Sequence, residues 1–185
     1  DGSYDQTSTR VKEWMKEVPN VQLVEHRWNQ GYGAALRTGF STAQFALICF
    51  TDADRQFELA DLRALLGRID ECHLVAGVRS PRQDPWHRRL LGRLWTWGMD
   101  RAFNVGVRDL NCAFKLVRKE ALSSFQLHST GAFINAEIVI RLREQGYEIQ
   151  EVPVRHRPRL EGTQSGANIK VIMQVWTKDT PFFQH

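Results

Sequence analysis

The longest apolar run of the chain covers residues 45–50 and lies between two segments with helical spacing. This run, Phe45-Ala46-Leu47-Ile48-Cys49-Phe50, is far shorter than the ~18 apolar residues that a membrane-spanning helix needs. A short, nearly continuous apolar run is typical of a parallel β-strand that is covered on both faces. We therefore expect a buried strand from Phe45 to Thr51.

Strand-like and helical segments alternate on both sides of this run. Helical spacing predicts helices over residues 7–17, 33–44, 59–69, 86–103 and 132–144, and strands are expected over 21–24, 73–78, 112–117 and 147–155. Such alternation predicts an α/β layered fold with a mostly parallel central sheet. The 185 residues show no internal repeat and no linker-like stretch, so we expect one domain over residues 1–185.

Two carboxylates follow the apolar strand directly. The sequence Thr51-Asp52-Ala53-Asp54-Arg55-Gln56 places Asp52 and Asp54 at the carboxyl end of the strand, where open α/β sheets bind their ligands. Hard oxygen donors suit Mg²⁺ or Mn²⁺, whose shell is completed by diphosphate oxygens, and Gln56 can add an amide oxygen. A solvated acidic loop that caps the next helix is the alternative. The apolar strand in front of the pair favours the metal site.

Two glycine-containing loops precede predicted helices, and with the carboxylate pair they resemble the motifs of a known family. The loops are Asp1-Gly2-Ser3-Tyr4-Asp5-Gln6-Thr7 and Asn29-Gln30-Gly31-Tyr32-Gly33-Ala34-Ala35. Glycosyltransferase family 2, in its dolichyl- or polyprenyl-phosphate mannosyltransferase-like branch, has Asp-Asp-Gly-Ser-x-Asp-x-Thr, then Asn-x-Gly-x-Gly-x-Ala, then Asp-Ala-Asp-x-Gln. Further matches at 77–79, 109–115 and 151–162 extend the resemblance over nearly the whole chain.

The resemblance implies a GT-A fold, which is Rossmann-like and binds nucleotide-diphospho-sugars. It implies metal-dependent, inverting transfer of mannose or glucose from GDP-mannose or UDP-glucose to a polyprenyl or dolichyl phosphate. The metal ligands that it implies are Asp52, Asp54 and Gln56. The implied donor-binding residues are Asp1, Gly2, Ser3, Asp5, Asn29, Gly31, Gly33, Asp52 and Arg159. The implied catalytic residues are Asp54, Arg79, Arg89 (or its neighbour Arg88), and Glu137 as a candidate base.

The chain departs from the family pattern at its beginning and near its end. The family's first strand, with its Pro-x-Tyr-Asn-Glu-like loop, has no counterpart. We therefore expect an N-terminally incomplete domain with an unpaired strand edge and marginal stability. The loop Gly162-Thr163-Gln164-Ser165-Gly166 lacks the Ser-Lys of better-known members, and no transmembrane segment follows Trp176. A truncated, non-catalytic remnant is therefore the alternative to an enzyme.

The nature of the acceptor depends on whether the chain has a general base. Many family members use an aspartate of a Glu-Asp motif, and the corresponding stretch here is Phe133-Ile134-Asn135-Ala136-Glu137. A lipid monophosphate is largely ionised at neutral pH, so it needs arginines to position it rather than a base to deprotonate it. The sequence therefore favours a phosphate acceptor. Transfer to a sugar hydroxyl with Glu137 as the base is the alternative.

Residues 79–93 carry five arginines against one acid and run into an apolar, tryptophan-bearing stretch. Such a pattern is typical of a helix that lies on a membrane surface. A core-packing helix with a solvated charged face is the alternative. A net charge of +4 without a recognised nucleic-acid motif gives no indication of nucleic-acid binding.

The chain has three cysteines, Cys49, Cys72 and Cys112, with no close pairing. This indicates small buried side chains in a reducing compartment. The polar opening residues show no signal peptide. We expect a cytoplasmic protein that is held peripherally at the inner face of the membrane.

Overall fold

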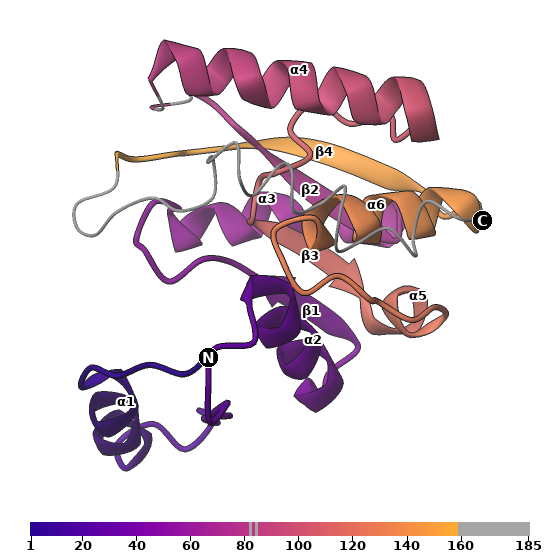
Figure 1. Ribbon diagram of the computed structural model, residues 1–185. Coiled ribbons are helices and arrows are strands. Elements are labelled where there is room, and N and C mark those ends of the chain that lie inside the picture. Colours follow the sequence, from indigo (N-terminus) through magenta and orange to yellow (C-terminus); the bar gives the residue numbers. More distant parts are fainter. Residues whose placement is uncertain (82, 84, 159–185) are drawn as a thin grey trace.

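The computed structural model of the chain describes residues 1–81, 83 and 85–158 (Figure 1). It contains both helices and strands, as the predicted α/β class requires. In chain order the elements are α1 Thr7–Met15, α2 Tyr32–Thr42, β1 Leu47–Phe50, the 3₁₀ helix η1 Leu59–Asp61, α3 Leu62–Leu66, the 3₁₀ helix η2 Ile69–Glu71, β2 Leu74–Arg79, α4 Trp86–Phe103, β3 Lys115–Arg118, α5 Lys119–Ser123, α6 Ile134–Glu144 and β4 Ile149–Val154.

The described strands form one mixed sheet in the order β1-β3-β2-β4. β2 pairs with β4 in parallel, whereas β3 pairs antiparallel with both β1 and β2. Strands β1, β2 and β4 therefore point the same way, and β3 lies between β1 and β2 in the opposite direction. The predicted α/β class is confirmed. The mostly parallel sheet holds for strand direction, but the reversal of β3 makes its pairings antiparallel, which the sequence pattern did not show.

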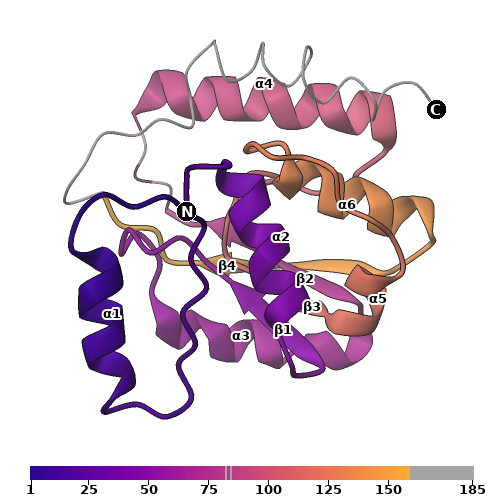
Figure 2. The same ribbon diagram turned by 60° about the horizontal axis from the view of Figure 1, so that its bottom comes forward.

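Helices cover both faces of the sheet, and each face has its own core (Figure 2). On one face, residues of all four strands pack against α2, α4, α5 and α6; this core includes Ile48, Leu74, Val117 and Ile149. On the other face, the sheet packs against α3 and η2, and Leu65 is completely buried there. The side chains therefore fill a three-layer arrangement, and the sheet edge at the ends of its strands stays accessible for loops.

Strand β1 corrects the expectation of a strand that is buried on both faces. Ile48 and Phe50 are buried, but Cys49 between them is exposed and Phe45 is 82% exposed. The buried face is covered by α2, where the rings of Phe40 and Phe50 lie 5.2 Å apart. β1 is an edge strand of the described sheet, so its apolar composition overstated its burial. Cysteines 72 and 112 are buried as predicted.

The strand expected at Val21 to Val24 does not form. No strand of the described sheet runs beside these residues to receive their hydrogen bonds, and Val24 is 48% exposed. The neighbouring helix α1 has no buried residue. Both views show α1 at the periphery of the molecule, away from the sheet (Figures 1 and 2). A hydrophobic pattern alone therefore does not make a strand where no partner strand is at hand.

Helix α4 has the predicted bounds, and its two sides differ in burial. Its inner side is packed: Met99 is buried, and the ring of Trp95 meets that of Phe133 at a centroid distance of 6.4 Å. Its outer side exposes apolar residues, namely Trp86, Leu90, Leu91, Leu94 and Trp97. Within residues 1–81, 83 and 85–158, no helix is long and apolar enough to cross a membrane. The expectations on residues 162–166 and on the segment after Trp176 lie outside the described residues.

Candidate active site

Several sequence motifs lie at the edge of the sheet that is formed by the carboxyl ends of its parallel strands. Because β1, β2 and β4 point the same way, their carboxyl ends meet at this edge, and the antiparallel β3 begins there. The register shows this directly, since Lys115 at the start of β3 pairs with Phe50 at the end of β1. Asp52 and Asp54 follow β1, and Arg79 ends β2. The edge is where an open α/β sheet binds ligands.

The loop after β1 is held in shape by its own polar groups. Asp52 and Asp54 are both half-buried, and Asp54 Oδ1 accepts the backbone N–H of Gln56 at 3.1 Å. Gln56 itself is buried, and its side-chain Nε2 donates to the carbonyl of Arg157 at 3.2 Å. The Arg157 N–H in turn donates to the carbonyl of Gln56 at 2.8 Å. Gln56 thus ties the loop to the segment that follows β4.

These residues fit a small divalent cation that also binds a diphosphate. No cluster of three or more His, Cys, Asp or Glu side chains suited to a metal occurs among the described residues. Mg²⁺ needs only one or two carboxylates when phosphate oxygens and water complete its shell. The buried hydroxyl of Tyr32 has no hydrogen-bond partner in the described part of the chain. Burial, and next the charge of Asp52, raises the pKa of Tyr32.

Arg79 is oriented by a carboxylate at the same edge. Its Nε and one terminal nitrogen each donate to Asp109 at 2.7 Å, and its backbone N–H adds a bond of 3.3 Å. Both side chains are nearly buried, at 11% and 8% exposure. Glu151, on β4, accepts the backbone N–H of Arg108 at 2.7 Å and so fixes the start of this loop. Fork-to-carboxylate pairing of this kind holds a guanidinium in one plane.

The glycine loop is packed against backbone and is anchored by Asp1. The Asp1 carboxylate accepts the N–H groups of Gln30 and Gly31, both at 2.9 Å, and lies 2.7 Å from Nδ1 of His26. A Cβ on Gly31 would stand 2.4 Å from the carbonyl oxygen of Thr130. A Cβ on Gly33 would meet the Ser129 carbonyl oxygen at the same distance. Glycine is therefore required here by the close approach of segment 129–131.

The remaining predicted donor residues lie at the surface or outside the described chain. Gly2 has φ +62° and lies against the backbone of Trp28 and Asn29, so it joins the two loops. Ser3, Asp5 and Asn29 are exposed. The Asp5 carboxylate accepts the N–H of Thr7 at 3.0 Å, and hydrogen bonds from the side chain and next from the backbone of Thr7 lower the pKa of Asp5. Arg159 lies beyond residue 158, and Arg89 is exposed on α4.

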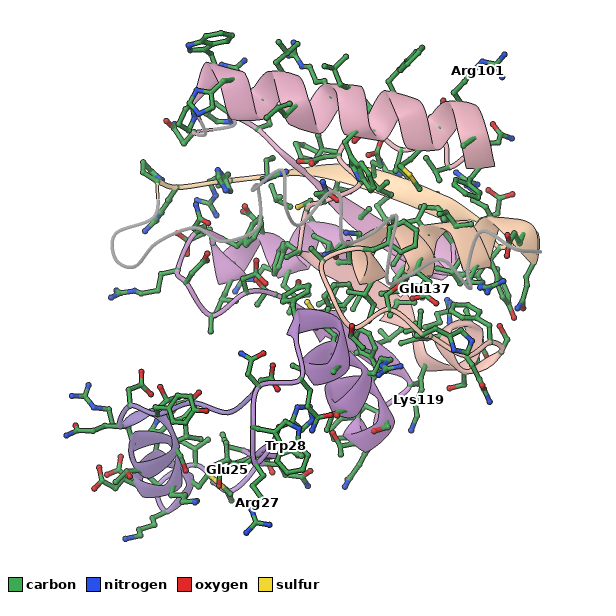
Figure 3. All side chains as sticks on the ribbon, in the orientation of Figure 1. Glu25, Arg27, Trp28, Arg101, Lys119 and Glu137 are labelled. Carbon is green, nitrogen blue, oxygen red and sulfur yellow. The ribbon has the colours of Figure 1, made fainter. Side chains whose placement is uncertain are left out.

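Glu137 does not have the surroundings of a general base. It is completely buried in the first turns of α6, and Figure 3 shows it in the interior of the molecule. One carboxylate oxygen accepts the N–H of His128 at 2.8 Å, and the other accepts the N–H of Ser129 at 2.9 Å. Since both oxygens are engaged and no solvent reaches them, Glu137 anchors the segment on which the glycine loop packs. These contacts give Glu137 an anchoring role, and its role as a candidate base stays a prediction.

Sequence reasoning missed Lys115 as a residue of this edge. It is completely buried, and burial lowers the pKa of its ammonium to about 8. The charges of Cys112 and Asp109 raise this pKa, and the charge of Arg79 lowers it. A lysine inside the apolar stretch from Cys112 to Val117 was the available signal, since lysine is almost never fully buried.

A groove of about 390 Å³ runs between α4 and the loop that follows it. Trp97 and Arg93 line it from the helix, and Arg108 lines it from the loop. Asp100 closes one part, where its carboxylate accepts the N–H of Gly106 at 2.7 Å. The groove therefore combines two cationic side chains with an indole ring on the α4 side of the molecule.

The chain belongs to Glycosyl transferase family 2, whose family model matches residues 1–125. The match covers the two glycine loops, the carboxylate pair and the Arg79–Asp109 pair described above. It confirms the resemblance on which the sequence interpretation rests.

Among curated proteins, the chain is similar to two kinds of polyprenyl-phosphate sugar transferase. It is 29% identical over 166 residues to a dolichyl-phosphate beta-glucosyltransferase of Trichomonas vaginalis, a match that covers 83% of this chain and 51% of the relative. It is 27% identical over 176 residues to an undecaprenyl-phosphate 4-deoxy-4-formamido-L-arabinose transferase of Edwardsiella ictaluri, covering 93% of this chain and 53% of the relative. The chain thus spans about half the length of these relatives.

Solved structures share the fold. Glucosyl-3-phosphoglycerate synthase from Mycobacterium tuberculosis, in complex with Mn²⁺, UDP and glucosyl-3-phosphoglycerate, matches with a TM-score of 0.63 at 16% identity. That match covers 88% of this chain and 60% of the synthase chain. The same synthase in complex with Mg²⁺ and UDP gives a TM-score of 0.63. These likenesses confirm the predicted GT-A fold.

Proposed function

We propose that the chain carries the donor site of a metal-dependent, inverting glycosyltransferase. It would move a sugar from a nucleoside-diphosphate sugar to a polyprenyl or dolichyl phosphate. The observation that carries this proposal is the meeting of Asp52 and Asp54 with the Arg79–Asp109 pair at one sheet edge. Carboxylates bind a divalent cation, and a guanidinium held in one plane binds phosphate oxygens. Together they suit a metal-bound diphosphate.

Each group then has a distinct task. Asp52 and Asp54 would hold Mg²⁺ or Mn²⁺, with Gln56 fixing their loop through Arg157 and offering its amide oxygen. The bound cation would neutralise the charge that builds up on the leaving diphosphate. Arg79, oriented by Asp109, would contact a phosphate group from the side of β2. The resemblance assigns Arg159 to the same diphosphate.

A phosphate acceptor is supported by the surroundings of Glu137 and by the relatives. Glu137 is completely buried and both of its carboxylate oxygens accept backbone N–H groups, which disfavours it as the base for a hydroxyl acceptor, whereas an ionised phosphate needs no base. The similar proteins are named for transfer to dolichyl and undecaprenyl phosphates. The similarity to a beta-glucosyltransferase favours glucose over mannose as the transferred sugar.

Helix α4 is the proposed contact with a membrane surface, where such an acceptor resides. Its outer side exposes Trp86, Leu90 and Trp97, and the basic Arg89 and Arg93 are exposed on the same helix. Arginines can reach lipid headgroups while indole and leucine side chains enter the acyl boundary. The groove beside Arg93 and Trp97 offers room for the acceptor phosphate.

Replacing Asp54 by Asn tests the donor site. We expect Asp54→Asn to weaken Mn²⁺-dependent binding of UDP or GDP by at least about 10-fold in calorimetry, since a metal ligand is lost. The thermal unfolding midpoint should stay unchanged because Asp54 is not in the core. The control is Asp70→Asn, whose side chain is 96% exposed on η2. Equal nucleotide affinity of the Asp54→Asn and wild-type chains would remove the metal assignment.

Replacing Arg89 by Ala tests the acceptor. The chain should transfer sugar to a short-chain polyprenyl phosphate and not to the matching polyprenol. Arg89→Ala should weaken use of the phosphate acceptor by about 10- to 150-fold, the equivalent of ~1.5–3 kcal/mol for a charge-assisted hydrogen bond. Arg101→Ala, in the last turn of the same helix, is the matched control. Transfer to the free alcohol at a comparable rate would support the hydroxyl-acceptor alternative instead.

A further inference from the structure

Lys115 is a cation enclosed by neutral acceptors. Its Nζ donates to the carbonyl of Leu110 at 3.1 Å, to the carbonyl of Cys112, and to Oδ1 of Asn135 at 3.3 Å. These three acceptors use all three ammonium protons. Within the described residues, the hydrogen-bond partners of Nζ include no carboxylate. The ring of Phe50 lies beside it, with Nζ 5.8 Å from the ring centroid.

These acceptors belong to two parts of the fold whose relative position matters for the candidate site. The carbonyls of Leu110 and Cys112 belong to the turn after Asp109, the residue that orients Arg79. Asn135 belongs to the first turn of α6, the helix that also carries Glu137. The ammonium therefore links the turn on one side of the site to the helix that anchors the glycine loop on the other.

Burying an ammonium costs several kcal/mol, and an apolar side chain could fill the same space without that cost. The ring of Phe50, which lies beside Nζ and belongs to the core, shows that an apolar side chain suits this position. The charge is therefore better explained by what it holds than by a contribution to folding stability.

We propose that Lys115 is a positioning residue of the nucleotide-sugar site. It holds the 110–112 turn against α6. It thereby fixes the position of the Arg79–Asp109 pair relative to the carboxylates that follow β1. This inference rests on the proposed function, because it assigns the diphosphate to the edge that these groups form. Removing the ammonium frees the turn and leaves its three acceptors without a donor, so donor affinity should fall even in a variant that still folds.

The test compares Lys115, at the start of β3, with a lysine that follows the end of the same strand. Lys115→Met removes the ammonium and keeps an unbranched apolar chain. Lys119→Met is the matched control, because Lys119 follows the same strand at its other end and donates to the carbonyl of Ala43 at 2.7 Å (Figure 3). Asn135→Ala breaks the Lys115 link from α6 and serves where Lys115→Met does not fold. The measurements are calorimetric affinity for UDP and GDP with Mn²⁺, the unfolding midpoint, and amide hydrogen exchange of residues 108–114.

We expect Lys115→Met and Asn135→Ala each to weaken nucleotide binding about 10- to 100-fold, with faster exchange of residues 108–114. The double variant should bind no more weakly than Lys115→Met alone, because both remove one link. Lys119→Met should bind as wild type does. Wild-type affinity in both site variants, or an equal loss in Lys119→Met, would overturn the inference alone. A wild-type chain that binds neither nucleotide would overturn the proposed function, and the positioning role with it.

Discussion

The N-terminal segment and the region from β3 to α6 both carry family motifs, but the fold holds them in different ways. In residues 1–31, α1 has no buried residue, and Trp14 and Trp28 are more than half exposed. From residue 109 to 142, most side chains are buried, including the charged Lys115 and Glu137. Figure 3 shows Trp28 near the periphery and Glu137 inside. The N-terminal motifs are held in place by a few polar contacts, whereas the motifs of the second region are held by the packing of the core.

The largest expected effect comes from the buried anchor Glu137. Glu137→Gln should destabilise the chain by about 2–4 kcal/mol, because the amide accepts only one of the two backbone N–H groups and turns its own NH₂ toward the other. Urea unfolding measures this. Glu144→Gln, at the exposed end of the same helix, should change stability by less than ~0.5 kcal/mol. If Glu137→Gln keeps wild-type stability but loses sugar transfer, Glu137 is a base after all.

Two glycines of α2 give an effect of intermediate size, because one lies against segment 129–131 and the other does not. In Gly33→Ala the new Cβ would meet three backbone atoms within 3 Å, so we expect a loss of about 1–3 kcal/mol. A Cβ on Gly39 would have no atom within 4 Å, and Gly39→Ala should stabilise the helix by about 0.5–1 kcal/mol. Thermal unfolding of the two variants should therefore shift in opposite directions. Equal shifts would mean that segment 129–131 does not press on the glycine loop.

The smallest effect is expected where the N-terminal segment is tied down. Asp1→Ala should cost about 1 kcal/mol, because its bonds to Gln30 and Gly31 are lost while the core is untouched. The change should be local, with faster amide exchange of residues 29–33 and unchanged exchange in α6. Asp5→Ala, which removes only the bond to Thr7, serves as the control and should leave residues 29–33 as they are. Faster exchange throughout the chain would show that the two regions are coupled.

Sequence periodicity predicted the elements well where local pattern decides them. The bounds of α4 agree at both ends, and β2 and β4 lie close to the predicted ranges. The pattern failed where a partner decides. Val21 to Val24 has no strand of the described sheet beside it, and β1 has an edge position that exposes Cys49. The direction of β3 is likewise a property of the sheet, which no window of the sequence contains.

The site was predictable in its chemistry and not in its internal contacts. Motif order identified Asp52, Asp54 and Arg79, and the structure brings them to one edge. The hydrogen bonds from the His128 and Ser129 amides to Glu137 join residues that are close in the sequence. The complete burial of Glu137, however, depends on the packing of the whole fold. The link from Lys115 to Asn135 spans β3 and α6 and depends on how they pack. Such relations follow from three-dimensional packing rather than from residue spacing.

The reversed strand β3 also sets the order in which the chain can assemble. β1 and β2 are synthesised before β3, yet they are not neighbours, and the strand between them is made only when residues 115–118 appear. Until then neither can complete its ladder, and the apolar residues of both stay without a sheet. Pairings between segments so distant in the chain slow folding and lengthen exposure to aggregation. The donor edge therefore forms only after β3 has joined β1 to β2 and β4 has paired with β2.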